Sequence, residues 1–339
     1  MSTGHVYVGC YTTGAGGEGT GIMLARRDLR TGELEEPVTV ATTPAPSYLV
    51  THPSLSVLYA VDEREVGAVA AFVIGDDLGL TPLGHDLTGG SLPCHLAVTP
   101  DGRHLLTANY GDGSVTVHRL GPDGALAGRT AHHVLGAGSK VDAERQAGPH
   151  AHEIVIEPDG LLRVVDLGGD AVYALRLADG VPTEVDSIPV RPGTGPRHLV
   201  AADGYVYVCG ELDASVTVFA ADAATGAWRE HDRVAAGTDK GALSEILLSA
   251  DGRFLYVASR GPDTIATFAL RDGHPTLVGE VGTGGSWPRQ VTRAGDLLYV
   301  ANERSHTVVV FRLDAATGLP APTGCVRHVP SPTCVHVMS

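Results

Sequence analysis

The chain has 339 residues, of which 43% are hydrophobic and 19% are charged, an ordinary balance for a globular protein. A chain of this length buries roughly three quarters of its unfolded surface, so its core needs no disulfide support. The formal net charge of −15 argues against nucleic acid as a partner, but a few arginines in a pocket still allow a small anionic ligand.

The five cysteines are scattered and form no CxxC pair. Their odd number and spacing predict reduced thiols in a cytoplasmic protein, not a disulfide framework or a zinc site. The N-terminal stretch MSTGHVYVGCYTTGAGG lacks a basic region followed by an apolar run, and no apolar segment approaches the length of a membrane span. We therefore expect neither a signal peptide nor a membrane partner.

In chain order, two strands near the N-terminus, HVYVGCYT and GIMLARRDL, precede a series of related segments. A degenerate copy begins at Pro46, and five clearer copies follow, beginning at Pro93, Pro149, Pro196, Leu243 and Pro288. An insertion, GAGSKVDAERQAGPHAH, lengthens the step before the first strand of the copy at Pro149. Each copy alternates strands and turns, as in HLAVTP, PDG, HLLTAN, YGDG and SVTVHRL, with room for a fourth strand in the linker.

Four short strands in a repeat of about 45 residues predict a propeller blade. The final PTCVHV, from Pro332, resembles a first strand with nothing after it, whereas HVYVGCYT resembles a second strand with no first strand. We therefore predict an all-β, seven-bladed β-propeller with four antiparallel strands per blade, whose closing blade combines both chain termini. We expect residues 1–339 to form one domain. A two-sheet sandwich, the alternative, explains neither the repeat nor the split unit.

Polar side chains gather at two positions of the repeat. The first strands begin with Ser47, Cys94, His152, Arg197, Ser244, Arg289 and Thr333, followed in turn by Tyr48, His95, Glu153, His198, Glu245, Gln290 and Cys334. The second strands end with Asp62 and Glu63, Asn109, Asp166, Glu211, Arg260, and Asn302 with Glu303. In a propeller, both sets are expected to face one mouth of the central channel.

The stretch GPHAHEIVIEPDG contains two histidines that differ in their position relative to the repeat. His152 is in phase with Arg197, whereas His150 lies in the insertion. A metal site built from Cys94, His95 and His152 is an open alternative, but neighbouring arginines would repel a cation. Hydrogen bonding to backbone alone is a second alternative for both histidines. We predict no metal and no cofactor.

GPHAHEIVIEPDG, with VVDLGGDAVYAL, PRHL and YVASRGPDTIATF, resembles the seven-bladed-propeller lactonases over nearly the whole chain. That family includes propeller-type 6-phosphogluconolactonases and fungal muconate-lactonizing enzymes. The resemblance to the muconate branch implies a catalytic set of His152, Arg197, Glu211 and Arg260. The shortened turn after Arg197 and the Cys209-Gly210 pair leave open a slip of one residue at Glu211.

This set suits the opening of a lactone. Two arginines bind a carboxylate or phosphate, or stabilise an oxyanion, and Glu211 and His152 can share the proton transfers. We add His95, Asn109, His150, His198 and Arg289 as substrate-binding candidates. Inter-blade salt bridges are the structural alternative for Arg197 and Arg260, and orientation of these arginines is the alternative for Glu211.

We therefore predict a metal-independent lactone hydrolase of the 6-phosphogluconolactonase type, acting on a small anionic sugar lactone. A muconate-type lactonizing cycloisomerase and a non-catalytic binding module are the alternatives, although only 5% of the residues are aromatic, which disfavours an apolar docking rim. The sequence contains no GxSxG elbow and no P-loop. We expect a monomer or a weak homo-oligomer.

Overall fold

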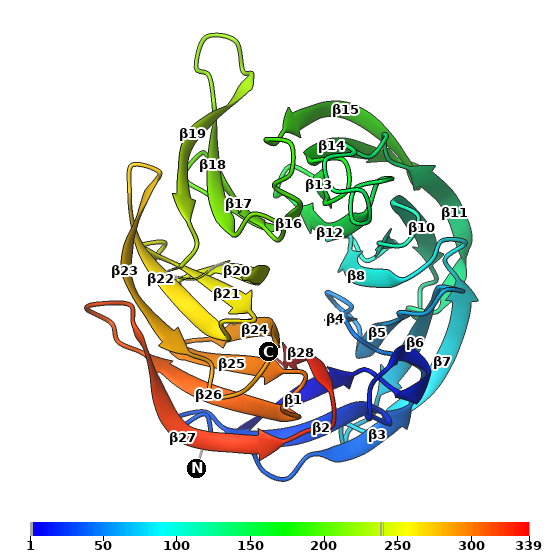
Figure 1. Ribbon diagram of the computed structural model, residues 1–339. Helices are drawn as coiled ribbons and strands as arrows, with labels where there is room; N and C mark the ends of the chain where they lie inside the picture. Colours follow the sequence, from blue (N-terminus) through cyan, green and yellow to red (C-terminus); the bar gives the residue numbers. More distant parts are fainter. Residues whose placement is uncertain (1–2, 238, 240, 339) are drawn as a thin grey trace. The chain divides into compact units, whose positions relative to one another are not determined.

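The computed structural model describes residues 3–237, 239 and 241–338. The described residues form seven four-stranded sheets (Figure 1) and, apart from the short 3-10 helix η1 (Thr13–Ala15), contain no helix. All strand pairs recorded within these sheets are antiparallel, as in the pair of β16 (Pro196–Ala202) with β17 (Tyr205–Gly210). The predicted all-β fold of seven four-stranded blades is confirmed.

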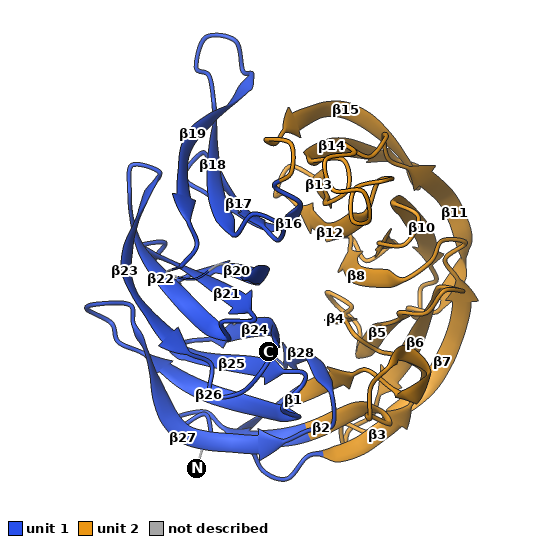
Figure 2. Ribbon diagram, in the orientation of Figure 1, with its two compact units in different colours: residues 1–6, 25–37, 194–339 blue, residues 7–24, 38–193 orange. Residues whose placement is uncertain are grey.

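The chain divides into two compact units, coloured separately in Figure 2. Unit 1 comprises residues 1–6, 25–37 and 194–339, and unit 2 comprises residues 7–24 and 38–193. The expectation of one domain over residues 1–339 stays a prediction.

Unit 1 contains three complete blades. The first consists of β16, β17, β18 (Ser215–Ala221) and β19 (Trp228–Ala235). The second consists of β20 (Ala242–Leu248), β21 (Phe254–Arg260), β22 (Thr264–Arg271) and β23 (His274–Gly282). The third consists of β24 (Pro288–Ala294), β25 (Leu297–Asn302), β26 (Thr307–Leu313) and β27 (Pro320–His328).

Unit 2 also contains three complete blades. The first consists of β4 (Leu49–Thr51), β5 (Val57–Asp62), β6 (Ala68–Ile74) and β7 (Leu80–Leu87). The second consists of β8 (Pro93–Val98), β9 (His104–Asn109), β10 (Ser114–Leu120) and β11 (Leu126–Val134). The third consists of β12 (Ala151–Ile156), β13 (Leu161–Asp166), β14 (Ala171–Ala178) and β15 (Val181–Pro189).

The seventh sheet joins the two ends of the chain. Its strand order is β28 (Pro332–Val337), β1 (Thr3–Cys10), β2 (Gly21–Asp28) and β3 (Val38–Thr42). The Met338 N–H donates to the His5 carbonyl over 3.0 Å. Two further bonds connect β28 to β24, because the Val335 N–H donates to Gln290 Oε1 and the Val335 carbonyl accepts from Thr292 Oγ1. The predicted closing blade is present.

The cores lie between neighbouring blades. In unit 1, one cluster packs Tyr207 and Val218 against Leu255 and Phe268, which belong to the next blade. The second strands β5, β21 and β25 are buried along their whole length, whereas the fourth strands are largely exposed, as β11 is. Each blade therefore depends on the apolar faces of its neighbours, and an unpaired strand would expose a large hydrophobic edge.

Deleting the last ten residues removes β28 from the closing sheet. We expect the truncated protein to lose solubility and to melt at a lower temperature, because β1 then presents an unpaired edge. The soluble fraction after expression and a circular-dichroism melt measure both effects. A truncated chain as soluble and heat-stable as the parent would show that β28 is dispensable.

His336 on β28 makes the stability of the protein dependent on pH. Burial lowers the pKa of His336 to about 4, well below the usual 6.5 of a histidine. Below pH 6.5 the unfolded chain therefore binds this proton while the folded chain does not, so stability falls as the pH falls towards 4. We expect His336→Gln to lose less stability than the parent between pH 7 and pH 4, by up to roughly 3 kcal/mol. Urea titrations at both pH values measure the difference, with His85→Gln on the exposed strand β7 as the control.

Candidate active site

A repeated β-bulge selects the side chains that begin the first strands. In β16, Pro196 pairs with Gly210 and His198 pairs with Cys209, so the register with β17 skips Arg197 between them. The strand register skips four further residues in the same way, namely Cys94, His152, Ser244 and Arg289. A bulge turns its extra side chain away from the regular alternation of the strand, and bulges recur beside active sites. The positions identified from the repeat therefore share one structural feature, the bulge at the start of the first strand.

In unit 1, Glu211 lies at the centre of a buried ion-pair cluster. Arg197 Nε donates to Glu211 Oε2 over 2.8 Å, and Arg260 Nη2 lies 2.6 Å from the same oxygen. All three residues are at most 6% exposed. Arg197 and Glu211 belong to the blade β16–β19, and Arg260 ends β21 of the next blade. The cluster thus joins two blades and provides the inter-blade salt bridges considered as the structural alternative.

The two guanidinium groups also bind backbone carbonyls. Arg260 donates from Nε to Ala242 and from Nη2 to Leu243, and Arg197 Nη1 donates to the carbonyl of Ser244. Burial lowers the pKa of Arg260 to about 10, with Glu211 opposing this shift and Arg197 and Arg289 adding to it. Arg260 remains charged at neutral pH. Within the described residues, no hydrogen bond engages Arg197 Nη2 or Arg260 Nη1, so each keeps donors for an anionic ligand.

Glu211 occupies a different repeat position from Asp166 and Asn109. Across the first strand of each blade, Asp166 pairs with Ala151 and Asn109 pairs with Pro93, but the equivalent partner of Pro196 is Gly210. Glu211 therefore lies just beyond the strand, which ends at Gly210, and the match of the family glutamate to Glu211 stays a prediction. Its N–H donates to the carbonyl of Gly195, as the N–H of Glu303 donates to Trp287.

Two other pairs flank this cluster in unit 1. His198 Nδ1 lies 2.8 Å from Glu245 Oε1, which places a histidine–carboxylate pair between β16 and β20. Arg289 Nη1 lies 3.9 Å from Glu303 Oε2, with both side chains about one fifth exposed. Imidazole paired with carboxylate is a common acid–base arrangement, and an accessible arginine suits an anion.

In unit 2, His150 and His152 both contact Tyr110. His150 stacks on the Tyr110 ring with centroids 4.5 Å apart, and the ring of His152 meets it edge-on at 5.7 Å. His150 Nδ1 lies 2.6 Å from the Tyr110 carbonyl, and Arg145 Nε donates to the Tyr110 hydroxyl over 3.1 Å. The insertion is therefore ordered around one aromatic ring.

Asp166 fixes the backbone beside these histidines. Its Oδ1 accepts N–H groups from His150, Gly168 and Gly169 at 2.7 to 3.0 Å. Burial raises the pKa of Asp166, opposed by these three hydrogen bonds. Asp166 therefore shapes the loop that carries His150.

The remaining unit 2 candidates have mixed surroundings. His95 packs on Tyr48 at 4.1 Å and accepts a weak bond from the Ile154 N–H at 3.4 Å. Asn109 is fully buried, and its Nδ2 donates to Ser114 and Thr116 of its own blade. These contacts favour a structural role for Asn109, and its binding of substrate stays an untested prediction.

The nine sequence-predicted residues fall on both units. His95, Asn109, His150 and His152 lie in unit 2, whereas Arg197, His198, Glu211, Arg260 and Arg289 lie in unit 1. The structure brings Arg197, Glu211 and Arg260 into direct contact in unit 1. A shared pocket for all nine residues stays a prediction.

Trp287 and Arg304 lie beside this cluster and are not among the residues predicted from the sequence. The Arg304 guanidinium carbon lies 3.4 Å from the centre of the Trp287 ring, and that of Arg260 lies 5.4 Å from it. The sequence did contain a signal, because one of only two tryptophans precedes Pro288 at the start of a first strand.

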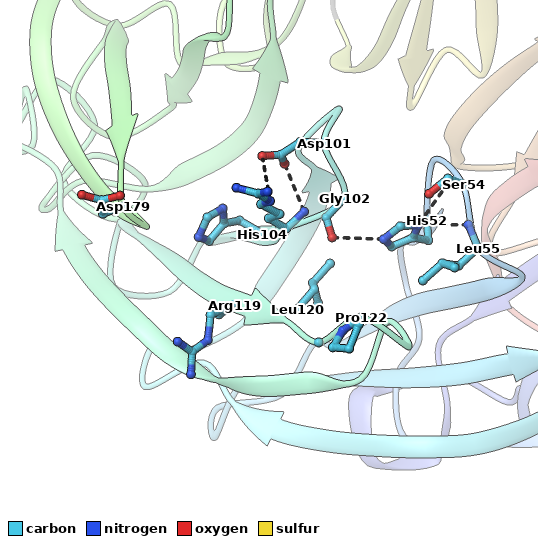
Figure 3. A pocket seen from close by; sticks show the side chains of 12 residues that line it. His52, Ser54, Leu55, Asp101, Gly102, His104, Arg119, Leu120, Pro122 and Asp179 are labelled. Atoms are coloured by element: carbon cyan, nitrogen blue, oxygen red, sulfur yellow. Dashed lines mark hydrogen bonds and ion pairs between the residues drawn. The ribbon is translucent and has the colours of Figure 1, made fainter.

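One cavity contains none of the predicted residues (Figure 3). It has a volume of about 640 Å³, lies in unit 2, and includes His52, Gly102, Arg119 and Asp179 in its lining. His52 Nδ1 accepts the N–H groups of Ser54 and Leu55, so its Nε2–H donates to the Gly102 carbonyl at 3.0 Å. With both ring nitrogens engaged, His52 stabilises two turns and has no lone pair for acid–base work.

Among the described residues, no three His, Cys, Asp or Glu side chains are grouped to hold a metal ion. The expected absence of a metal and a cofactor stays a prediction. In the same part of the chain, no helix is long and apolar enough to cross a membrane.

Comparisons with known proteins agree with this architecture. The family model described as lactonase, 7-bladed beta-propeller, matches residues 5–337. A Bacillus subtilis protein named 6-phosphogluconolactonase is 36% identical over 97% of both chains, and one of the same name from Formosa agariphila is 29% identical over 92% of this chain and 93% of its own. The periplasmic gluconolactonase structure of Pseudomonas aeruginosa superposes with a TM-score of 0.91 at 32% identity, covering 100% of this chain and 99% of that chain. The chain therefore belongs to the seven-bladed β-propeller lactonase family.

Proposed function

We propose that this protein hydrolyses a small anionic sugar lactone, with 6-phosphogluconolactone as the substrate class. The observation that carries the proposal is the buried cluster of Arg197, Glu211 and Arg260, in which two guanidinium groups retain unused N–H donors beside one carboxylate. Family membership and the similarity to a named 6-phosphogluconolactonase support the reaction type.

Hydrolysis of a lactone requires two proton transfers and stabilisation of one oxyanion. A base takes a proton from water as the water oxygen attacks the carbonyl carbon, and the carbonyl oxygen becomes an oxyanion. The ring C–O bond then breaks, and an acid protonates the departing ring oxygen to give the open hydroxy acid. The free donors of Arg197 and Arg260 are suited to bind the oxyanion.

Glu211 and His152 are the proposed acid–base pair. Glu211 contacts two guanidinium groups, which stabilise negative charge on its carboxylate. His198, paired with Glu245, is a further imidazole on the same blade as Arg197. The variants below separate these roles.

We propose that catalysis needs no metal ion. The cationic Arg197 and Arg260 disfavour a nearby cation, in contrast to the carboxylate-rich and amide-rich sites of calcium-dependent sugar lactonases. Cytoplasmic location and a monomeric or weakly oligomeric state are proposals from the sequence. Cell fractionation and analytical ultracentrifugation test these two.

Glu211→Gln keeps the side-chain shape and removes its charge. If Glu211 transfers protons, we expect kcat for lactone opening to fall by about a hundredfold or more, corrected for spontaneous opening. Stability should also fall, by about 3–5 kcal/mol, because two buried guanidinium groups lose their partner. Glu157→Gln is the matched control, since it breaks the buried-arginine pair with Arg163 and should leave kcat unchanged.

Variants of the other candidate residues distinguish a role in substrate binding from a role in the chemical step. Arg197→Ala or Arg260→Ala should chiefly raise KM if the arginine binds the anionic group, and should lower kcat if it holds the oxyanion. His152→Ala should lower activity more than His150→Ala. Folded His152→Ala and Glu211→Gln proteins that open the lactone at the parental rate would refute this site.

Chelation tests the metal-independent proposal. We expect protein dialysed against EDTA to keep its full lactonase activity, because arginine supplies the positive charge. Activity is measured before and after chelation, and again with added zinc or calcium. Loss on chelation with recovery on adding either ion would revive a metal site at His150 or His152.

A further inference from the structure

Trp287 occupies a strained backbone position that its blade could fill with a smaller residue. Its φ is 64°, in the left-handed region, and its N–H donates to Asp263 Oδ1 over 2.8 Å. The residue preceding the first-strand proline also has positive φ in other blades, where it is Ala45, Leu92, Gly195 or Ser331. Left-handed φ is costly for a bulky residue, so the backbone gives no reason for tryptophan. The reason therefore lies in the indole ring.

The ring contacts two guanidinium groups. With its guanidinium carbon 3.4 Å from the ring centre, Arg304 stacks nearly parallel to the indole, because a tilted group would clash at that separation. A stacked guanidinium keeps its N–H donors in its own plane, directed away from the ring. Arg260 lies 5.4 Å from the same ring centre, so Trp287 connects Arg304 to the ion-pair cluster.

The charge of Arg304 is not neutralised. Arg64 holds the same repeat position in the blade β4–β7, where its Nε and Nη2 donate to the two oxygens of Asp62, each at 2.6 Å. In the blade of Arg304 the equivalent of Asp62 is Asn302. No carboxylate within the described residues pairs with Arg304, which is exposed.

We propose that Arg304, stacked on Trp287, binds the phosphate group of a phosphorylated sugar lactone. This inference rests on the lactone hydrolysis proposed above and names the group that decides substrate preference. In such a substrate the phosphate lies at the opposite end of the carbon chain from the carbonyl. Donors of Arg197 and Arg260 serve the carbonyl end, and Glu303 opposes the charge of Arg289 at 3.9 Å, so the phosphate needs a further cation.

The test compares 6-phosphoglucono-δ-lactone with glucono-δ-lactone. We expect Arg304→Ala to lower the preference for the phosphorylated lactone, the ratio of the two kcat/KM values, by about tenfold or more, mainly through KM. Arg304→Lys should keep part of the preference, because it retains charge without the planar fork. Arg253→Ala is the matched control, since Arg253 also stacks on an aromatic ring, Phe254, but pairs with Asp251.

Calorimetric titration with the products gives a readout independent of turnover. We expect Arg304→Ala to weaken the binding of 6-phosphogluconate about tenfold relative to gluconate. If the parent hydrolyses the lactone and Arg304→Ala keeps the parental preference, the phosphate role is overturned and the proposed function stands. An equal loss on both substrates also overturns it. A parent that opens neither lactone overturns the proposed function, and with it the lactone phosphate as the ligand of Arg304.

Discussion

The bulge at the start of the five first strands β8, β12, β16, β20 and β24 is the constraint on which the candidate site depends. Without the bulge, the regular alternation of the strand would fix the face to which Arg197 and His152 point. Apolar residues could then occupy these two positions equally well. In these five blades the bulge releases one side chain from the strand register. The fold thereby provides a fixed set of variable positions while the surrounding strands keep their apolar packing. Chemistry can then differ between blades without disturbing the core.

Local charge at these positions differs from the charge of the whole molecule. The chain carries a net charge of −15, yet the residues around Glu211 contain more guanidinium groups than carboxylates. Burial strengthens these interactions, because the low dielectric of the interior screens them less than water does. An anionic ligand therefore meets a positive region that the overall composition does not indicate.

The fold could be read largely from the sequence, because each copy carries its own turns and alternation, and because PTCVHV and HVYVGCYT are incomplete alone. The bulge residues were also identified, since their distance from the following turn is nearly constant. Glu211 was harder to place, because Gly210 takes the last paired position of β17 and moves the carboxylate one residue beyond the strand. Trp287 and Arg304 escaped detection for a different reason. Their importance comes from a ring contact between residues 17 positions apart, which no periodicity reveals.

The contrast between Asp62 and Asn302 shows how a protein built from repeats can gain specificity when one copy loses the carboxylate that pairs with an arginine. The arginine occurs at this position in two copies, and in one of them, as Arg64, it is paired with a neighbouring carboxylate. Exchanging a single carboxylate oxygen for an amide nitrogen removes that ion pair with almost no change in side-chain volume. A search for binding groups in repeat proteins can therefore compare the pairing partners of a residue that several copies share. It need not be limited to residues that occur in one copy alone.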